Sequence, residues 1–450
     1  MNRIRIRWMI RVCIVGVVSI AGAQSVVAQC AFDWRPGDGE PTFEYTLSAM
    51  TTWDPDGPGP LPATLVVGGA FSTAGGVPAE AIACWDGATW QPLGAGINGG
   101  LNPRVYVLTV FNGDLIAGGD FTSAGGVSAN NIARWDGMAW HPLGTGMNGR
   151  VRALTVHNNE LIAGGQFTTA GDVAASRIAR WDGMAWHSLG SGMGGSGASV
   201  FALAVYNADL IAGGLFTTAG GVSAYYIARW DGTAWNPLGM GTNNSVIALA
   251  VVDDALIAGG YFTATCGVEA RRIARWEGTG WQPLGMGMSS TSTQFPYVAD
   301  VTVYNGDLIA GGYFTSAGDE IANNIARWDG MGWHPLGTGV AGNYPWVTAL
   351  AVYGGELIVG GAFTTAVDNV SPCWARWGPD CARGDLNCDQ LVDSADVPLF
   401  VDALLSTQPL TVCEAYTANV NGDMDCAGGP RVDASDIQPF VDCVLGGLCP

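Results

Sequence analysis

Hydrophobic and polar positions follow one pattern that repeats along most of this chain. The repeated unit reads approximately LTVYNGDLIAGGYFTSAGGVSANNIARWDGMAWHPLGTGM. A Gly-Gly-x-Phe motif marks each copy, with phenylalanines 46 to 52 residues apart: Phe71, Phe121, Phe167, Phe216, Phe262, Phe314 and Phe363. A period of about 50 residues is typical of β-propeller blades and is longer than most helical-pair or leucine-rich repeats.

Each unit contains four segments with strand character. The first alternates apolar and polar residues, as in Val151–His157, and the second is a nearly continuous apolar run, as in Leu161–Gly165; such a run predicts a strand buried on both faces. The third reads IARW, as in Ile132–Trp135, and an Asp-Gly turn leads to the fourth, Ala139–Gly144. This spacing is a hairpin signal. Because residues 40–378 show no sustained helical periodicity, we expect an all-β fold.

The seventh unit lacks its fourth strand, and the N-terminus offers a matching segment. After Trp377 the chain continues as GPDCARGDLN, whereas Phe32–Pro36 reads FDWRP and matches the AWHP segment of other units. We therefore predict a seven-bladed β-propeller in which the N-terminal strand completes the last blade. Such closure removes the exposed sheet edges of an open array.

The order of these segments resembles the kelch family of propellers. A di-glycine strand is followed by an aromatic residue, a turn and a Trp-x-Pro-Leu strand. The matching positions include Gly118, Gly119, Trp135, Trp140 and Leu143. The resemblance covers residues 31–378 and implies a kelch-type fold of seven blades.

Residues that recur in every unit are expected to build the scaffold, because a single site would not need seven copies. The paired tryptophans suit contacts between blades, with carbohydrate stacking as the alternative for those at the rim. Recurring arginines and acids predict ion pairs within or between blades, with a ring-shaped anion site as the alternative. The arginines are Arg134, Arg180, Arg229, Arg275, Arg327 and Arg376, and the acids are Asp114, Glu160, Asp209, Asp307 and Glu356.

The sequence offers few catalytic candidates. His141, His187 and His334 share one repeat position that elsewhere holds Gln, Asn or Arg, which predicts a solvent-facing polar site. No Ser/His/Asp arrangement, metal-binding His pair or phosphate-binding glycine loop is found, so no catalytic residue is assigned. Asp300 is a lone candidate acid, because glycosidase carboxylates can come from distant loops.

Connections that differ in length between units are the best place for specificity, as loops often carry function. Neutral drift in length is the alternative. The connections are Gly99–Arg104, Gly194–Ser199 and Ser289–Tyr297.

The first 23 residues have the features of a signal peptide. Four arginines precede an apolar run, Val12–Ala23, that ends in Ala-Gly-Ala. An uncleaved anchor is the alternative, but the run is short for a span and no stop-transfer pattern follows. Cleavage would change the formal net charge from −20 to −24, which disfavours nucleic-acid binding. We therefore expect a secreted, extracellular or cell-surface protein without a membrane span after cleavage.

From Asp380 onward the composition changes to acids, cysteines and helix-forming runs. The segment Asp385–Asp396 places oxygen ligands at loop positions that suit Ca²⁺, and a helix should follow at about Ala395–Leu405. The expected ligands are Asp385, Asn387, Asp389, the Leu391 carbonyl, Asp393 and Asp396. A related segment, Asn419–Asp436, comes later.

Two loop-helix units of this kind resemble a type I dockerin over residues 384–447. The resemblance implies a second set of calcium ligands: Asn419, Asn421, Asp423, Asp433 and Asp436. Gln390 replaces the usual loop glycine, and six extra residues enlarge the second loop. The resemblance also implies a cohesin-like or cell-surface partner; a calcium-stabilised tail without such a partner is the alternative.

Ten of the 11 cysteines remain after cleavage, an even number that suits disulfides outside the cytoplasm. Both Cys30 and Cys381 fall between the third and fourth strands of blade seven, so we predict that they pair.

Two functions compete on these grounds. The first is a secreted, non-catalytic binding or scaffold protein, with a propeller platform for a carbohydrate or protein and a calcium-dependent docking tail. The alternative is an extracellular carbohydrate-active enzyme with its site on the propeller; a self-associating structural component of the cell surface is a third possibility. A catalytic propeller should gather non-repeating acids or a histidine pair at one mouth, whereas a binding module should show only repeated or neutral residues there.

Overall fold

The computed structural model describes residues 32–37, 46–57, 59, 61–292, 294–367, 369–379, 396–397 and 399–401. The predicted signal peptide, Cys30 and Cys381, and every predicted calcium ligand except Asp396 lie outside these residues. Phe32–Pro379 belong to one compact unit, and it is described here by itself. Within the described ranges, no helix is long and apolar enough to cross a bilayer.

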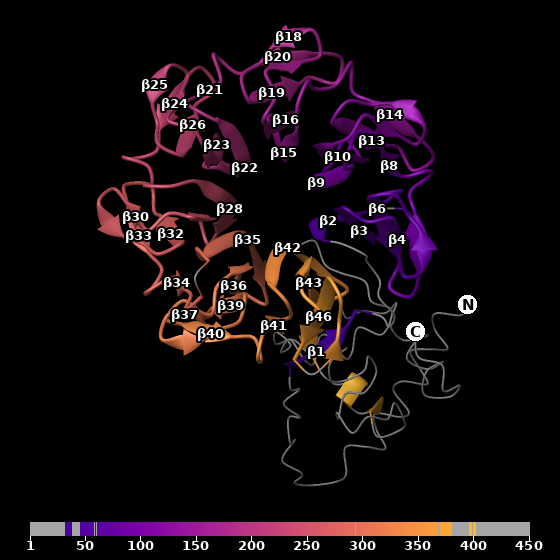
Figure 1. Cartoon of the computed structure of the whole chain (residues 1–450), viewed down its shortest axis with the longest axis vertical. Helices are drawn as coiled ribbons and strands as arrows, with labels where there is room; N and C mark the ends of the chain where they lie inside the picture. The colour runs from indigo at the N-terminus through magenta and orange to yellow at the C-terminus, as the bar shows by residue number, and fades with distance from the viewer. Residues whose placement is uncertain are drawn as a thin grey trace, which may run out of the picture. The chain divides into compact units, whose positions relative to one another are not determined.

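Seven four-stranded antiparallel sheets surround a common centre in this unit (Figure 1). In sheet 2 the strands follow one another outward from the centre: β9 (Arg104–Phe111), β10 (Asp114–Asp120), β13 (Ile132–Trp135) and β14 (Trp140–Pro142). Each inner strand contacts the inner strands of both neighbouring sheets, and the last of them contacts the first, so the ring is closed. The architecture is a β-propeller, as the repeat predicted.

The other sheets repeat this order. Sheet 1 contains β2 (Leu47–Trp53), β3 (Thr64–Gly69), β6 (Ile82–Trp85) and β7 (Trp90–Pro92). Sheet 3 contains β15 (Val151–His157), β16 (Glu160–Gly165), β19 (Ile178–Trp181) and β20 (Trp186–Ser188). Sheet 4 contains β22 (Ser199–Tyr206), β23 (Asp209–Leu215), β26 (Ile227–Trp230) and β27 (Trp235–Pro237). Sheet 5 contains β28 (Val246–Val252), β29 (Ala255–Gly260), β32 (Ile273–Trp276) and β33 (Trp281–Pro283). Sheet 6 contains β35 (Tyr297–Tyr304), β36 (Asp307–Tyr313), β39 (Ile325–Trp328) and β40 (Trp333–Pro335).

Sheet 7 is assembled from both ends of the unit. It contains β42 (Trp346–Tyr353), β43 (Glu356–Ala362), β46 (Trp374–Pro379) and, at its outer edge, β1 (Phe32–Pro36). The register places Trp34 opposite Trp377, which is the pairing of third- and fourth-strand tryptophans in every other sheet. In Figure 1 the indigo β1 lies against the orange strands of sheet 7. The predicted closure by the N-terminal strand is confirmed.

Short additional strands, which the repeat pattern did not predict, join neighbouring sheets. Between the second and third strands of each sheet lies a small hairpin: β4 (Thr73–Ala74) with β5 (Val77–Pro78), β11 (Ser123–Ala124) with β12 (Val127–Ser128), β17 (Thr169–Ala170) with β18 (Val173–Ala174), β24 (Thr218–Ala219) with β25 (Val222–Ser223), β30 (Ala264–Thr265) with β31 (Val268–Glu269), β37 (Ser316–Ala317) with β38 (Glu320–Ile321), and β44 (Thr365–Ala366) with β45 (Asn369–Val370). Four hairpins pair with a strand from the link that arrives from the preceding sheet: β8 (Ile97–Asn98), β21 (Met193–Gly194), β34 (Met288–Ser289) and β41 (Val340–Ala341).

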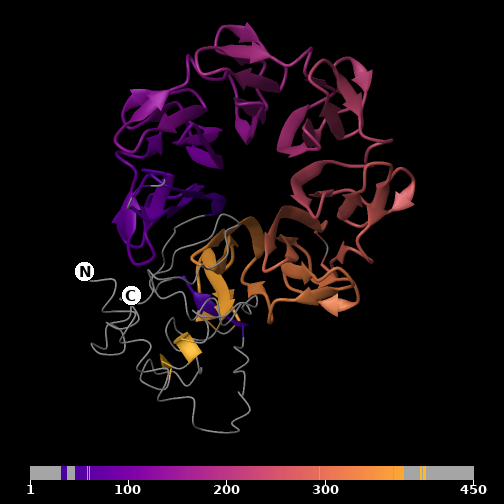
Figure 2. The same cartoon turned by 180° about the vertical axis from the view of Figure 1, so that it is seen from behind.

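These connections give the ring two different faces. We call the end that carries the hairpins and the links between sheets the linker face, because the pairing of β8 with β11 brings both together there. The opposite end carries the tight turns that follow the first and third strands, such as Asn112–Gly113 and Asp136–Gly137, and we call it the turn face. Figure 2 shows the same ring from behind.

The di-glycine of each second strand is explained by two close approaches. In sheet 3, a Cβ on Gly164 would lie 2.5 Å from Cγ1 of Val200 in the next sheet. A Cβ on Gly165 would lie 2.0 Å from the Arg150 carbonyl oxygen on the inner strand. The register shifts by one residue at this point, so that Arg152 is left as a β-bulge. Glycine is required here because any side chain would push either the neighbouring sheet or the inner strand away.

Tryptophans connect each sheet to the one before it. In sheet 3, Trp186 stacks on Trp181 with ring centroids 5.3 Å apart, and its Nε1–H donates to the Leu143 carbonyl of sheet 2 at 3.0 Å. The same bond recurs at Trp34, Trp140, Trp235, Trp281 and Trp333, each to a leucine carbonyl of the preceding sheet. The structural role predicted for these residues is confirmed, since their polar atoms are used within the scaffold.

The seam between sheets 7 and 1 is packed differently. Where other sheets begin their third strand with isoleucine, sheet 7 has Trp374, which contacts Trp85 and Trp90 of sheet 1 with centroids 5.9 and 5.2 Å apart. Where the other fourth strands are followed by leucine, β1 is followed by Gly37, and a Cβ there would lie 2.1 Å from Nε1 of Trp374. The large indole therefore fills space that a leucine would otherwise take.

Candidate binding site at the linker face

The repeated arginines and acids form ion pairs within their own sheets. Arg134 lies 2.5 Å from Asp114, and the equivalent pairs form at Arg180–Glu160, Arg229–Asp209, Arg327–Asp307 and Arg376–Glu356. Sheet 5 has Ala255 in place of the acid, and Arg275 lies 3.2 Å from Glu277 instead. The predicted ion pairs are confirmed. The ring-shaped anion site was the alternative, and these guanidinium groups already have carboxylate partners.

The three equivalent histidines support turns on the turn face. Nε2 of His141 lies 2.6 Å from Oδ2 of Asp136, whose Oδ1 accepts hydrogen bonds from the N–H groups of Met138 and Ala139. The backbone N–H bonds, followed by the His141 contact, hold the pKa of Asp136 at about 2. His187 and His334 bind Asp182 and Asp329 in the same way. The position was predicted to be polar and solvent-facing; it is polar but half-buried, and the aspartate partner was missed.

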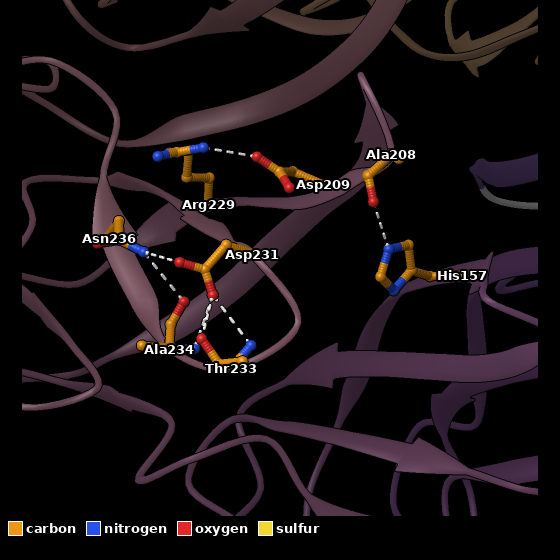
Figure 3. Close-up of polar contacts among 8 residues, drawn as sticks. All are labelled: His157, Ala208, Asp209, Arg229, Asp231, Thr233, Ala234 and Asn236. Carbon is orange, nitrogen blue, oxygen red and sulfur yellow. Dashed lines mark hydrogen bonds and ion pairs between the residues drawn. The ribbon is translucent and has the colours of Figure 1, made fainter.

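Figure 3 shows this arrangement in sheet 4, where asparagine replaces the histidine. Asp231 accepts hydrogen bonds from Thr233, from the Ala234 N–H and from Asn236. His157 takes a separate role at the end of β15: its Nε2 lies 2.8 Å from the Ala208 carbonyl of the next sheet. These histidines therefore stabilise turns and contacts between sheets.

Asp300, the lone candidate acid, joins two inner strands. Its Oδ1 accepts from the Val301 N–H and its Oδ2 from the Leu350 N–H of sheet 7, each at 2.8 Å. Burial raises the pKa of Asp300 to about 7, although these two hydrogen bonds act to lower it. The other six sheets place alanine or valine at this position, so the acid is specific to sheet 6. No second acid is assigned to it as a catalytic partner.

The predicted calcium site lies almost wholly outside the described residues. Of its ligands, the structure describes Asp396 alone; it is buried, and its carbonyl accepts the Phe400 N–H at 2.9 Å. Residues 397 and 399–401 are helical, within the predicted helix. Among the described residues there is no cluster of three His, Cys, Asp or Glu side chains that could hold a metal. Cys84 and Cys266 are free thiols in the propeller, so the expected disulfides do not involve them.

The bulged residues of the inner strands differ from sheet to sheet. Seven equivalent positions hold seven residue types, which we call the axial ring: Ser48, Tyr106, Arg152, Phe201, Ile247, Ala299 and Thr348. All seven side chains are half-buried, near the starting, linker-face end of the innermost strands. The residue immediately before each of them is valine in six sheets and leucine in the first, and is fully buried. Variation is therefore concentrated at the side chains nearest the centre.

Four residues of sheets 2 to 4 form what we call the arginine–aromatic cluster: Arg104, Tyr106, Arg152 and Phe201. The Arg152 guanidinium carbon lies 4.4 Å from the Tyr106 ring centroid and 5.7 Å from that of Phe201. The Arg104 guanidinium carbon lies 5.3 Å from the centroid of the same tyrosine ring, and its Nη2 donates to Oγ of Ser48 at 2.6 Å. Cation–π contacts of this kind hold the guanidinium planes against the rings.

Arg152 differs from the repeated arginines in having no carboxylate partner among the described residues. Its Nε is buried without a hydrogen-bond partner there. Burial lowers the pKa of Arg152, and the nearby positive charges of Arg150 and Arg104 lower it further. Arg150 is exposed and already pairs with Asp120, with 2.7 Å between Nε and Oδ2. The cluster thus concentrates positive charge in a chain whose formal net charge is −20.

A second sheet-specific group of aromatic residues lies at the linker face of sheets 5 and 6. The rings of Tyr261 and Tyr297 are 4.7 Å apart, and those of Tyr297 and Tyr313 are 6.5 Å apart. Burial raises the pKa of Tyr297. The Tyr313 hydroxyl lies 2.7 Å from Oγ of Ser292 in the link between sheets 5 and 6.

The three connections of unequal length all lie on this face, and two of them expose a large apolar side chain: Leu101 is 101% exposed and Phe295 is 80% exposed. In the link to sheet 7, Tyr344 is 68% exposed. Gly194–Ser199 joins β21 to β22 on the same face. The sequence predicted specificity at these links but did not predict the arginine–aromatic cluster. A comparison of the seven positions after the first-strand valine would have revealed it.

The linker face carries non-repeating charges, which a simple binding module was not expected to show. On the inner strands and next to them, these charges are Arg104, Arg150 and Arg152 and the acids Asp120 and Asp300, which are held by Arg150 and by backbone N–H groups respectively. The hairpins of this face carry further non-repeating acids: Asp172, Glu269, Asp319 and Glu320.

Comparisons with known proteins agree with the propeller architecture. Residues 91–253 match the family described as the Rax2 C-terminal beta propeller domain. No curated protein matches the chain. Among solved structures, the chain is similar to the extracellular domain of a hybrid two-component system from B. thetaiotaomicron (11% identity, TM-score 0.48), with 77% of this chain matching 40% of that one. The chain therefore spans less than half of that protein's length.

Two further structures are similar at the same level. The computationally designed Ika8 protein has 17% identity and a TM-score of 0.43, covering 74% of this chain and 85% of that one. The WD40 beta propeller domain of Doa1 has 14% identity and a TM-score of 0.46, covering 78% and 97%.

Proposed function

We propose that this protein is a secreted binding or scaffold protein whose seven-bladed, kelch-like propeller presents its linker face to a carbohydrate or protein ligand. The observation that carries the proposal is the axial ring. Seven equivalent, half-buried positions hold seven residue types, directly beside a position that is valine in six of seven sheets. A scaffold requirement would act alike on every sheet, so this contrast favours recognition at the centre of the linker face.

The surrounding surface supports the same proposal. Exposed Leu101, Phe295 and Tyr344 lie on the links around the ring, and large exposed apolar side chains on loops are typical of interaction sites. Aromatic and arginine side chains are also the residues that most often dominate binding energy.

We further propose that the C-terminal segment binds Ca²⁺ and docks to a cohesin-like or cell-surface protein. The support is the ligand spacing of Asp385–Asp396 and its second copy. Capture of such a partner by the full chain should require calcium and should be lost in Asp385→Ala and Asp396→Ala. Capture that persisted in chelator and in both variants would contradict the docking role.

The binding face can be tested by blocking each face of the ring in turn. Leu101→Cys on the linker face and Met184→Cys on the turn face place a thiol at sites that are 101% and 86% exposed. Each variant is coupled to a polyethylene glycol maleimide and applied to arrays of carbohydrates and of purified cell-surface proteins. Unsubstituted protein treated in the same way controls for Cys84 and Cys266.

We expect the bulky group at position 101 to abolish binding and the same group at position 184 to leave it unchanged. Equal binding by both labelled variants, or loss only from the turn-face label, would refute recognition at the linker face.

A further inference from the structure

The arginine–aromatic cluster has the chemistry of a subsite for an anionic group. Arg152 belongs to the innermost strand of sheet 3, and its neighbours on both sides are aromatic rings of sheets 2 and 4. A guanidinium group that is half-buried loses hydration, and it recovers this free energy best by hydrogen bonding to a planar anion. Its carboxylate partner is missing among the described residues, whereas each repeated arginine of the third strands has one.

The protein's own acids do not fill this role. Asp120 is the nearest acid that influences Arg152, and its carboxylate pairs with the exposed Arg150. Arg104 is held by hydroxyl groups, those of Thr46 and Ser48, which orient it without neutralising its charge. Two guanidinium groups without a carboxylate partner among the described residues thus contact the Tyr106 ring.

We propose that Arg152, with Arg104 at the same Tyr106 ring, binds the carboxylate of a small organic acid at the linker-face end of the ring's centre. This inference rests on the proposed binding function and names the ligand chemistry of that site. The guanidinium fork matches the two oxygens of a carboxylate. The rings of Tyr106 and Phe201 supply apolar surface for the carbon body beside it. At the equivalent positions of sheets 6 and 7 the side chains are the smaller Ala299 and Thr348.

The test is calorimetric titration of the full chain with three probes: sodium galacturonate, sodium glutarate and neutral galactose. We expect both acids to bind and galactose to bind at least tenfold more weakly. Tighter binding of galacturonate than glutarate would identify a sugar acid as the source of the carboxylate, and the reverse order would identify an aliphatic acid. Failure of both acids to bind more tightly than galactose would overturn the proposal.

Substitutions locate the subsite. Arg152→Gln should weaken binding of the acid at least tenfold, and Arg152→Lys should weaken it less because the charge remains without the planar fork. The matched controls are Arg150→Gln and Arg134→Gln, which remove arginines that already have carboxylate partners and should change affinity less than threefold. Equal affinity in wild type and Arg152→Gln would overturn the assignment to Arg152. If Arg152→Gln does not fold, the comparison of Arg152→Lys with Arg134→Gln decides in its place.

The results of the carboxylate titrations can be distinguished from those of the face-blocking experiment. A neutral carbohydrate or a protein that is lost on linker-face labelling, together with no carboxylate binding, would retain the binding function and remove only the carboxylate subsite. Carboxylate binding that the linker-face label leaves intact would remove the proposed face.

Discussion

At the scale of single residues, most of the repeated polar atoms are used inside the scaffold. The indole N–H of each fourth-strand tryptophan in sheets 2 to 7 donates to a leucine carbonyl of the preceding sheet. A carbonyl left without this donor would be buried and unsatisfied, which costs about 1–3 kcal/mol. These bonds therefore contribute to holding adjacent sheets in register.

Replacing one such indole should destabilise the ring by more than the loss of ring area alone. Trp186→Phe removes the donor to Leu143 and keeps an aromatic ring in the stack. The control is Trp181→Phe, on the partner tryptophan that donates no hydrogen bond to the described residues. Chemical denaturation should show Trp186→Phe to be less stable than the control by about 1–2 kcal/mol; equal losses would show that the bond is not needed.

Asp300 should make stability depend on pH. Because burial raises its pKa from the usual 3.8 to about 7, the folded chain holds a proton here that the unfolded chain releases between these pH values. This acid therefore favours the folded state at low pH, and that contribution is lost as the pH rises from about 4 to 7. The melting temperature of Asp300→Asn should rise relative to that of the wild type as the pH increases from 4 to 8. A difference that does not change with pH would contradict the assignment.

The sequence predicted the roles of residues whose partner is another recurring side chain. An arginine and an acid recur together in nearly every unit, so the pattern predicted that they form ion pairs. In sheet 5, Ala255 replaces the acid and Arg275 pairs with Glu277 instead. The hydrogen bonds that the indole N–H groups donate could not be predicted from the pattern, because their acceptors are backbone carbonyls, which every residue carries. The Asp136–His141 contact was missed for a related reason: glutamine and asparagine at the histidine position concealed its link to the aspartate that recurs in five of the sheets.

At the scale of strands, the di-glycine creates the bulge that presents the axial ring. The second glycine lets the Arg150 carbonyl approach the strand, and the first lets the next sheet approach. The alternating pattern of the first strand predicted its position but gave no sign of the bulge, since the shift in register is set by contact between two strands. The predicted fourth strand, Ala139–Gly144, was also too long, because β14 ends at Pro142 where the link begins.

A single methyl group at the first glycine should therefore be costly. Gly164→Ala would place a Cβ 2.5 Å from Val200, and overpacking of this kind typically costs about 1–3 kcal/mol. Gly280→Ala is the matched control, because that site has no atom within 4 Å and other units carry alanine there. Denaturation curves should show the first variant destabilised and the second unchanged or slightly stabilised; a tolerated Gly164→Ala would argue against the close approach of the sheets.

The seam between the chain's ends offers a test of compensating volumes. Gly37→Leu restores the leucine that follows the other fourth strands but would collide with Trp374. Trp374→Ile restores the usual third-strand residue and leaves a cavity. Each single variant should lose several kcal/mol, on the scale of large changes in core volume of about 3–5 kcal/mol. The double variant should recover much of this loss, and additive losses would contradict the packing at the seam.

At the scale of the whole propeller, the repeats predicted the architecture but not the arginine–aromatic cluster. Seven similar units with a missing fourth strand predicted a ring closed by Phe32–Pro36, and the pairing of β1 with β46 confirmed this. Arg152 was not predicted, because it occurs once at its position and so is not part of the repeat. Function in such a ring is found by asking where equivalent positions differ most, and here that is the axial ring.

The central claim is that the sheet-specific residues at the linker-face centre bind ligand while the repeated residues form the scaffold. Amide hydrogen exchange of the full chain, with and without saturating sodium galacturonate, tests it most directly. We predict slower exchange in the starting segments of β9, β15 and β22, around Tyr106, Arg152 and Phe201, and no change at the turns between third and fourth strands, such as Asp136–Gly137. Protection centred on those turns, or spread evenly over all seven sheets, would contradict the claim.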